Sequence, residues 1–385
     1  KATTKPQSVK GAFLRMLTVY QRNFIINTLN QKNMKRLLSI DIFRGITIFF
    51  MILVNTQAGG SFDFLIHIPG YGWRIADLVY PSFIFIMGAS MYLSMRKYVE
   101  APPTDLYKHI FRRTVLIFLM GIIFNWIPFD QNLLDVRILG VLQRIAIVYL
   151  ICSLLVIKVR SIPTLLSISG LILGFYYLLT MKGYEIVDAV DLAIIGTKHM
   201  YTPTHDPEGL LSSIPSVVNA IIGYVSARIL TENELKERLI KMSTIAISMI
   251  ALAYILHWTI LPIYKTYWSS SFGLLTSGIS LLAWIVVHLI CDVWGKKDWG
   301  IAFDVLGKNS IVCYLLSALI AEFFRKYGIA DDIISFYQGF MSQQFVSLSW
   351  GLTVVLLCLL AGYPLYVKDL YKIIICYRIY YYTVN

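Results

Sequence analysis

Charged side chains are scarce in this chain of 385 residues. Only 15% of the residues are Asp, Glu, Lys or Arg, whereas 57% are hydrophobic, and the mean hydropathy is +0.66. An average soluble domain carries about 25% charged and about 45–50% apolar residues. The scarcity of charge excludes a disordered chain, an ordinary basic nucleic-acid module and most soluble enzymes. It indicates an all-α polytopic membrane protein.

Cysteine is also sparse, and its spacing gives no sign of a metal site or a disulfide framework. The five cysteines form no CxxC pair, and four of them lie inside or beside apolar runs. We therefore interpret them as small buried hydrophobic residues and predict no metal site. The two halves of the sequence show no internal repeat.

The first 33 residues differ from the rest. They begin polar and basic, and the apolar stretch 11–29 is interrupted by Arg15, Arg22 and two asparagines. This stretch is too polar for a membrane span, and it lacks the small-residue cleavage site of a signal peptide. We interpret 1–33 as an extension at the membrane surface or a mis-assigned start, and 34–385 as the membrane domain.

Ten apolar runs have about 20 residues, the length that crosses a bilayer. They lie near residues 38–58, 75–95, 110–128, 138–157, 162–180, 210–229, 242–261, 270–291, 301–323 and 345–367. If the N-terminus is cytoplasmic and the loops alternate, 19 Lys and Arg fall on the cytoplasmic side and seven on the outer side. The net charge of +12 is thus a topology signal, which predicts about ten transmembrane helices with both termini cytoplasmic. The longer connections 59–74, 181–209 and 324–344 then lie outside.

Ionisable side chains inside a span cost about 3 kcal/mol or more and mark candidate sites. The inner level holds Asp41, Arg44, Asp304, Lys308 and Asn309. The outer level holds Asn55, Asp77, Gln143 and Arg144, under loops that carry His67, Asp206 and Glu208. Two polar levels fit a transporter, and they equally fit an enzyme whose two substrates come from opposite sides. Asp41 and Arg44, three residues apart, can also be a purely structural pair on one helix face.

Two outer segments permit a structural and a functional interpretation. His67 lies in a loop with Gly and Pro residues, ten positions before Asp77, so the loop can fold the imidazole towards the carboxylate. Such a carboxylate fixes the tautomer and raises the basicity of a general base. In the second segment, Asp206 and Pro207 can be the N-cap and first residue of the next helix, with Glu208 favouring its N-terminus. The alternative is a carboxylate aimed at a sugar.

Six segments, in order along the chain, together resemble one known family. They are Arg36–Gly45 followed by Leu53-Val54-Asn55, His67–Ser90, Arg137–Arg144, His205–Leu211, Lys265–Phe272 and Gly307–Ile311. The sequence is similar to the heparan-α-glucosaminide N-acetyltransferase family of transmembrane acetyltransferases. The resemblance covers residues 36–311, nearly the whole membrane domain.

The resemblance implies an N-acetyltransferase that uses cytosolic acetyl-CoA. The acetyl group passes to the amine of a glucosamine-like sugar on the outer side. The family's active-site residues match His67 and Asn55, and its aspartate at the start of the next span matches Asp77. We expect His67 to be the general base or an acetyl carrier, and Asn55 to donate a hydrogen bond to the developing oxyanion.

Further site residues follow from the needs of the two substrates. The phosphates of CoA need cations, so we predict Arg44, Arg144 and Lys308 as donor-binding residues, with Arg112 and Arg113 at the cytoplasmic mouth. The predicted acceptor-binding residues are Asp206, Glu208 and Trp268. His67 is followed by a less polar run than is usual in the family, which leaves the acceptor open. Heparan sulfate itself is not expected, because the chain lacks the large lumenal domain of the animal enzyme.

The expected partners are the lipid bilayer, acetyl-CoA and an amino-sugar or glycan acceptor, with no nucleic acid. The resemblance also allows a homodimer. We place the protein in a membrane, the inner membrane if the source is bacterial, with His67 on the periplasmic or outer side. The rival interpretation is a transporter or flippase of a polar or lipid-linked solute, which intramembrane charges also suit. The missing internal repeat disfavours it.

Overall fold

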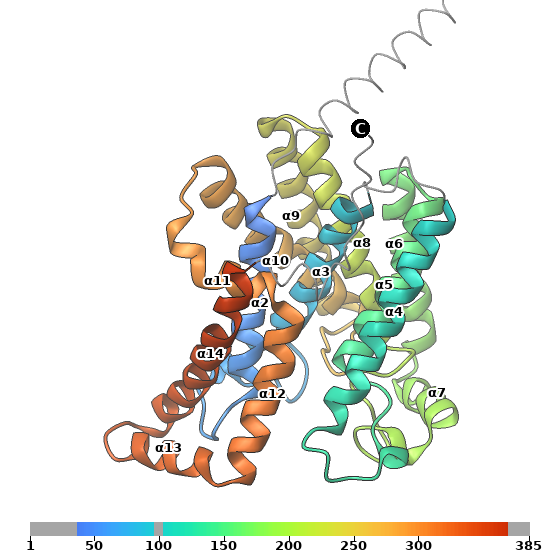
Figure 1. Ribbon diagram of the computed structural model, residues 1–385. Helices are drawn as coiled ribbons and strands as arrows, with labels where there is room; N and C mark the ends of the chain where they lie inside the picture. Colours follow the sequence, from blue (N-terminus) through green and yellow to red (C-terminus); the bar gives the residue numbers. More distant parts are fainter. Residues whose placement is uncertain (1–36, 96–102, 369–385) are drawn as a thin grey trace, which may run out of the picture. The chain divides into compact units, whose positions relative to one another are not determined.

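The computed structural model describes residues 37–95 and 103–368, and in this part of the chain the secondary structure is helical without strands. The helices are α2 (Leu38–Asn55), α3 (Ile75–Met95), α4 (Pro103–Trp126), α5 (Val141–Lys158), α6 (Ile162–Thr180), α7 (Glu185–Ile195), α8 (Ser213–Glu232), α9 (Leu235–Thr259), α10 (Ser270–His288), α11 (Ile301–Lys308), α12 (Ser310–Lys326), α13 (Ile329–Gln338) and α14 (Gln343–Val367). Figure 1 shows their arrangement. The predicted extension 1–33 lies outside the described residues.

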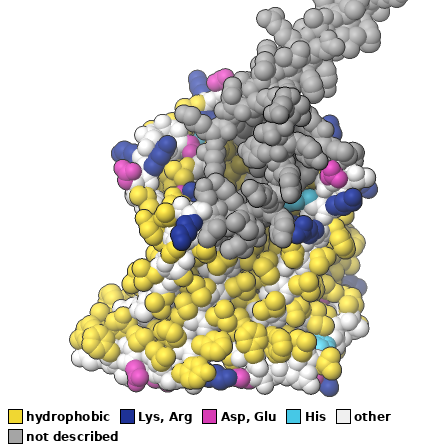
Figure 2. Space-filling model, in the orientation of Figure 1, with side chains coloured by type: hydrophobic (Ala, Val, Ile, Leu, Met, Phe, Trp, Pro, Cys, Tyr) yellow, Lys and Arg dark blue, Asp and Glu magenta, His cyan; other side chains and the backbone are white. Residues whose placement is uncertain are grey.

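Eight of the described helices are long and apolar enough to cross a membrane, namely α2, α3, α5, α6, α8, α9, α10 and α14. They correspond to eight of the ten predicted runs, and α3 and α6 match the predicted bounds at both ends. On the face of the molecule that Figure 2 draws, hydrophobic side chains form a continuous band, with charged side chains towards its edges. The prediction of an all-α polytopic membrane protein is confirmed. The four cysteines of the described part are free and buried, as predicted.

The other two predicted runs behave differently. The run 110–128 lies in α4, which is not among the eight helices, so the number of ten spans stays a prediction. The run 301–323 was predicted as one helix, but α11 and α12 are bent by 78° at Asn309. The reason is local, because the Asn309 side chain donates to the carbonyls of Val305 and Gly362 and competes with the helical backbone.

Small residues let neighbouring helices approach closely at two crossings. A Cβ on Gly45 of α2 would lie 1.7 Å from the carbonyl oxygen of Phe303 in α11. A Cβ on Gly88 of α3 would lie 1.9 Å from the carbonyl oxygen of Ala220 in α8. Glycine at helix crossings is a common packing device in membranes. The two crossings hold α2 and α3, the helices that carry the candidate site.

Successive helices alternate in direction, so the connections after α2, α4, α6, α9 and α12 emerge at one end of the bundle. Figure 1 shows α7 and α13 at this end, which we call the loop end. Loops distant in sequence bind each other here. Gly72 N donates to Ile263 O over 2.8 Å, and Ile138 N donates to His199 O over 3.1 Å. Gln343 Nε2, at the end of the connection 324–344, donates to Ala58 O over 3.3 Å. The three longer connections predicted to share one side thus emerge at the same end of the bundle (Figure 1).

The segment before α8 does not cap that helix. The helix begins at Ser213, so the prediction that Asp206 is the N-cap and Pro207 the first helical residue is wrong. Residues 206–212 form turns, in which Asp206 Oδ1 accepts from Glu208 N over 2.9 Å. The Asp206 carboxylate instead accepts hydrogen bonds from Arg137 of another loop.

Candidate active site

The loop between α2 and α3 folds the imidazole of His67 back onto Asp77, as the spacing predicted. His67 Nδ1 lies 2.8 Å from Asp77 Oδ1. The second carboxylate oxygen accepts from the backbone N–H groups of Arg74 over 2.8 Å and Ile68 over 3.3 Å. Because a carboxylate only accepts hydrogen bonds, Nδ1 carries the ring proton and Nε2 presents its lone pair. Asp77 is buried, whereas 46% of the His67 side chain is exposed, so the imidazole is accessible.

A cation stands beside this pair. Lys265 Nζ lies 3.4 Å from Asp77 Oδ1. Lys265 belongs to a tight turn in which Trp268 N donates to Lys265 O over 2.9 Å and Trp268 has a positive φ of 52°. Burial lowers the pKa of the Lys265 ammonium below its ordinary value, and the neighbouring Asp77 partly offsets that effect.

These groups line a pocket at the loop end, which measures about 560 Å³ when the space open to solvent is included. Five predicted site residues share it, namely Asn55, His67, Asp77, Glu208 and Trp268. Its other polar lining residues are Tyr80, Lys265 and Tyr314. Apolar walls with a few converging polar groups are typical of a site for a small molecule. In the described residues, no group of three or more His, Cys, Asp or Glu is placed to hold a metal ion.

Asn55 closes the pocket on the side of α2. It occupies the last helical position, its side chain is exposed, and Tyr314 of α12 lies beside it. An amide at this position can donate to an oxygen of a bound molecule. The pocket therefore combines an accessible imidazole, His67, with a neutral hydrogen-bond donor, Asn55.

Arg137 holds the segment 206–208 at the rim of the pocket. Its Nε donates to Asp206 Oδ2 over 3.0 Å, and its Nη2 donates to Asp206 Oδ1 and to Glu208 Oε2, each over 2.5 Å. Burial opposes the charge of Arg137, but the two carboxylates outweigh it and raise its pKa above the ordinary value. Asp206 is 1% exposed and committed to this pair. Of the two predicted acceptor carboxylates, Glu208 is the one that lines the pocket.

The structure does not bring Arg144 to the other two predicted donor-binding cations. Arg144 is 1% exposed, and its guanidinium donates to Ser213 Oγ over 3.1 Å and to Pro207 O over 2.7 Å. The same guanidinium lies 5.0 Å from the centre of the Trp268 ring. Trp268 in turn donates to Asn219 Oδ1 over 3.2 Å. Arg144 and Trp268 therefore pack together and hold the segment before α8 in place.

Arg44 and Lys308 lie where α2 crosses α11, in what we call the paired-charge cluster. Arg44 Nη1 is 3.4 Å from Asp41 Oδ1, and Arg44 Nη2 donates to Ser90 Oγ. Lys308 Nζ is 2.6 Å from Asp304 Oδ2. The two cations and two carboxylates balance, so the cluster has no net charge.

Sequence reasoning assigned no role to three residues that shape the site. Lys265 and Arg137 both stand in the quoted segments, so a signal was present for them. Tyr314 lies in the apolar run 301–323, where a tyrosine is unremarkable as a packing residue. Its role is visible only once α12 is placed against α2.

Comparisons with known proteins identify the family of this chain. A family model described as heparan-alpha-glucosaminide N-acetyltransferase, catalytic, matches residues 36–268, which is more than half of the chain. The matched region includes His67, Asp77, Arg137 and Lys265.

Two curated proteins are also similar. The chain is 27% identical to heparan-alpha-glucosaminide N-acetyltransferase of Homo sapiens over 357 positions, covering 75% of this chain and 54% of the human protein. It is 25% identical to the protein of the same name of Mus musculus over 366 positions, covering 77% of this chain and 56% of the mouse protein. The chain thus spans about half the length of these relatives. On the strength of the family match, the chain belongs to the heparan-alpha-glucosaminide N-acetyltransferase family.

Proposed function

We propose that this protein transfers an acetyl group from acetyl-CoA to the amine of a glucosamine-like sugar, in the pocket at the loop end. The observation that carries the proposal is the His67–Asp77 pair in one pocket with Asn55. The relatives are named as N-acetyltransferases of an α-glucosaminide, which supports an amino sugar as acceptor. The family match favours an acyltransferase over a transporter.

The proposed reaction begins when the acceptor amine attacks the carbonyl carbon of the thioester. His67 Nε2 takes the proton that the amine loses, and Asp77 stabilises the imidazolium that forms. Asn55 Nδ2 donates to the oxyanion of the tetrahedral intermediate. When the intermediate collapses, the carbon–sulfur bond breaks and the thiolate of CoA takes the proton from His67. A general base contributes about 10²–10⁴-fold and an oxyanion donor about 10²–10³-fold.

A covalent route uses the same nitrogen. His67 Nε2 can attack the thioester itself and carry the acetyl group to the amine. Rapid quenching with labelled acetyl-CoA and no acceptor separates the two routes. The covalent route predicts labelled protein that is lost in His67→Ala, and direct transfer predicts none.

The donor is proposed to bind from the end opposite the loop end, which the Lys and Arg asymmetry marks as cytoplasmic. Arg44 and Lys308 of the paired-charge cluster lie towards this end and are proposed to assist in phosphate binding. Arg112 and Arg113 of α4 are proposed to contribute further positive charge to the binding of the CoA phosphates. Glu208 is proposed to accept hydrogen bonds from sugar hydroxyl groups.

Acetyl transfer is the direct test. Purified protein in lipid nanodiscs is incubated with radiolabelled acetyl-CoA and a panel of amino sugars and their glycosides. We expect labelled acetamido sugar, and thermal stabilisation of the protein by CoA. Absence of both, together with saturable solute uptake into proteoliposomes, would contradict the proposal and support a transporter.

A further inference from the structure

Four tyrosines lie in contact with one another at the loop end, in what we call the tyrosine cluster. Its members are Tyr71 of the loop between α2 and α3, Tyr184 before α7, and Tyr264 and Tyr267 of the connection before α10. The ring centres of Tyr71 and Tyr264 lie 4.8 Å apart, and those of Tyr184 and Tyr267 lie 4.6 Å apart. Tyr264 joins the two pairs, at 5.5 Å from Tyr184 and 5.4 Å from Tyr267. The four rings therefore form one continuous aromatic group.

Backbone hydrogen bonds hold together the two loops that supply Tyr71 and Tyr264. These two residues pair as an antiparallel bridge, and Gly72 N donates to Ile263 O over 2.8 Å. Tyr264 N also donates to Ser269 Oγ over 3.0 Å. A tyrosine ring supported in this way offers a large contact area to a ligand at a low cost in conformational entropy.

The tyrosine cluster adjoins the active-site pocket through the same two loops. Tyr71 follows His67 by four residues, and Tyr264 directly precedes Lys265. His67 and Lys265 line the pocket, whereas the four tyrosines are not among its lining residues. The cluster thus lies beside the pocket, next to the loop segments that supply the imidazole and the ammonium.

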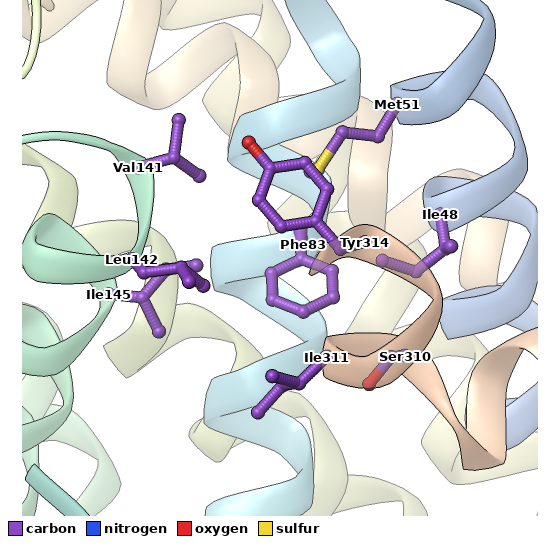
Figure 3. A pocket seen from close by; sticks show the side chains of 9 residues that line it. All are labelled: Ile48, Met51, Phe83, Val141, Leu142, Ile145, Ser310, Ile311 and Tyr314. Atoms are coloured by element: carbon purple, nitrogen blue, oxygen red, sulfur yellow. The ribbon is translucent and has the colours of Figure 1, made fainter. Parts of the chain in front are cut away.

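The deep end of the pocket does not suit a polar molecule. Met51, Val141 and Tyr314 line the pocket and also border a small apolar space deeper in the bundle, where Phe83 lies against Tyr314 (Figure 3). Phe83 is 9% exposed and Tyr314 4% exposed, so both rings are packed. A sugar ring placed there would lose the hydrogen bonds of its hydroxyl groups to water. An acceptor with its amine at His67 and a further sugar attached therefore extends towards the loop end.

One member of the tyrosine cluster is accessible from the loop end. Tyr71 is 62% exposed, whereas Tyr184, Tyr264 and Tyr267 are partly buried. The face of an aromatic ring carries partial negative charge, so it attracts the polarised C–H groups on one face of a pyranose ring. The phenol hydroxyl adds a hydrogen-bond donor and acceptor. Tyr71 can therefore bind a sugar ring, with Tyr264 supporting it.

Polar groups border the tyrosine cluster on the side of α7. Asp188 Oδ2 accepts from Tyr267 OH over 2.7 Å, and Asp188 Oδ1 lies 2.7 Å from His205 Nδ1. The Asp188 side chain is 25% exposed, so it remains within reach of solvent. Aromatic rings beside partly exposed polar groups provide for both the C–H groups and the hydroxyl groups of a sugar.

We propose that the tyrosine cluster is a second sugar-binding subsite, in which Tyr71 binds the sugar to which the reacting amino sugar is linked. The acceptor class is then a glycan of two or more sugars with the amino sugar at its end. The inference rests on the proposed function and adds the part of the acceptor that lies beyond the reacting ring. It gives a role to an exposed aromatic ring that three others hold beside the pocket.

Acceptors of two lengths test the subsite. Methyl α-glucosaminide supplies only the reacting sugar, and a disaccharide of glucosamine α-linked to glucose supplies one sugar more. Acetyl transfer from acetyl-CoA to each is measured in nanodiscs for wild type, Tyr71→Ala and Tyr71→Trp. Tyr327→Ala is the matched control, because Tyr327 is 68% exposed and its ring contacts Phe323 of α12 rather than the tyrosine cluster.

We expect Tyr71→Ala to lower kcat/KM about fivefold or more for the disaccharide, mainly through KM, and less than about twofold for the monosaccharide. Tyr71→Trp should retain the use of the disaccharide, and Tyr327→Ala should resemble the wild type with both acceptors. An equal loss with both acceptors in Tyr71→Ala, as for an anchor at the membrane interface, or no loss with either, overturns the subsite. Wild-type protein that acetylates neither acceptor would instead overturn the proposed function.

Inhibition by the acetylated disaccharide measures binding at the subsite without its own turnover. This product keeps the second sugar and cannot accept another acetyl group on its nitrogen. We expect Tyr71→Ala to raise its inhibition constant about fivefold or more against the monosaccharide reaction, with little change for the acetylated monosaccharide. An unchanged inhibition constant for the acetylated disaccharide in a folded variant contradicts the role of Tyr71.

Discussion

At the scale of single residues, the chemistry depends on how four donors share the carboxylate of Asp77. Two backbone N–H groups and the imidazole bind it, and the ammonium of Lys265 stands 3.4 Å away. The backbone donors fix the carboxylate, and the carboxylate fixes the ring of His67. Lys265 adds a positive charge to these contacts, and burial lowers its pKa below the ordinary value.

The lowered pKa of Lys265 leads to a prediction about alkaline pH. A lysine with a lowered pKa is charged below that pKa and loses its charge as the pH rises through it, earlier than an exposed lysine. We expect kcat/KM to fall over this alkaline range, because the cation beside the pocket favours the developing oxyanion. Measurement of kcat/KM from pH 6 upward locates the decline.

Two variants distinguish loss of the Lys265 charge from a general disruption of the site. Lys265→Arg keeps its charge at higher pH, so the alkaline decline should move upward. Lys265→Met should lower kcat/KM by about tenfold or more at neutral pH and abolish the decline. If the decline stays in place in Lys265→Met, another group causes it.

At the scale of elements, the loop end is held by Arg137. Its two hydrogen bonds to Asp206 and one to Glu208 join the loop before α5 to the segment before α8. A lysine offers a point charge and does not reproduce this fork.

We expect Arg137→Lys to raise KM for the amino sugar about tenfold and to change kcat less, because Glu208 loses its support at the rim. Steady-state kinetics at varied acceptor concentration measures both values. Arg325→Lys is the control, since Arg325 pairs with Glu322 on an exposed surface where ion pairs contribute little. A fall in kcat without a change in KM would place Arg137 in the chemistry rather than in acceptor binding.

The crossing of α2 and α11 gives a stability prediction. Gly45→Ala puts a methyl group 1.7 Å from a backbone oxygen of α11. Relieving this overlap requires one of the two helix backbones to move, which costs free energy. We expect a loss of about 1–3 kcal/mol, visible as a Tm several degrees lower in detergent. Gly170→Ala in α6 meets nothing within 4 Å and should leave Tm unchanged or slightly raised. Equal Tm values for both variants would show that the crossing is not as close as described.

The apolar runs predicted the positions of the helices because of the bilayer. Each span must pair its backbone N–H and C=O groups internally over about 20 residues, which a helix does. The break at Asn309 was not predicted, because hydropathy averaged over about 20 residues hides a short polar run. Gly307, Lys308 and Asn309 were nevertheless a local signal, since glycine and asparagine favour helix ends.

A contact between two site residues was predictable from the local sequence only where both residues share a short segment. His67 and Asp77 are ten residues apart in one loop, so their contact could be inferred from turn-forming residues. Lys265 and Glu208 come from other loops, more than 100 residues away in the sequence. No local pattern records such contacts, and they arise from the packing of α3 against α8 and α10.

At the scale of the whole molecule, the orientation in the membrane remains a prediction from the Lys and Arg asymmetry. Single cysteines test it in intact cells. Thr202→Cys lies exposed at the loop end, and Lys297→Cys lies exposed after α10 at the opposite end. We expect a membrane-impermeant maleimide to label the first directly and the second only after permeabilisation, relative to the unsubstituted chain. The reverse pattern would invert the orientation.

The central claim is that His67 performs the proton transfer or acetyl transfer in the pocket at the loop end. The most direct measurement compares labelled acetyl transfer to the best amino sugar by wild type, His67→Ala and His199→Ala in nanodiscs. His199 is the control, because it lies at the same end, bonds to Val136 O and does not line the pocket.

We expect His67→Ala to lose transfer by about 10²-fold or more, while its Tm and its stabilisation by CoA stay close to those of the wild type. His199→Ala should retain transfer. Full transfer by a folded His67→Ala protein would show that His67 takes no part in the reaction.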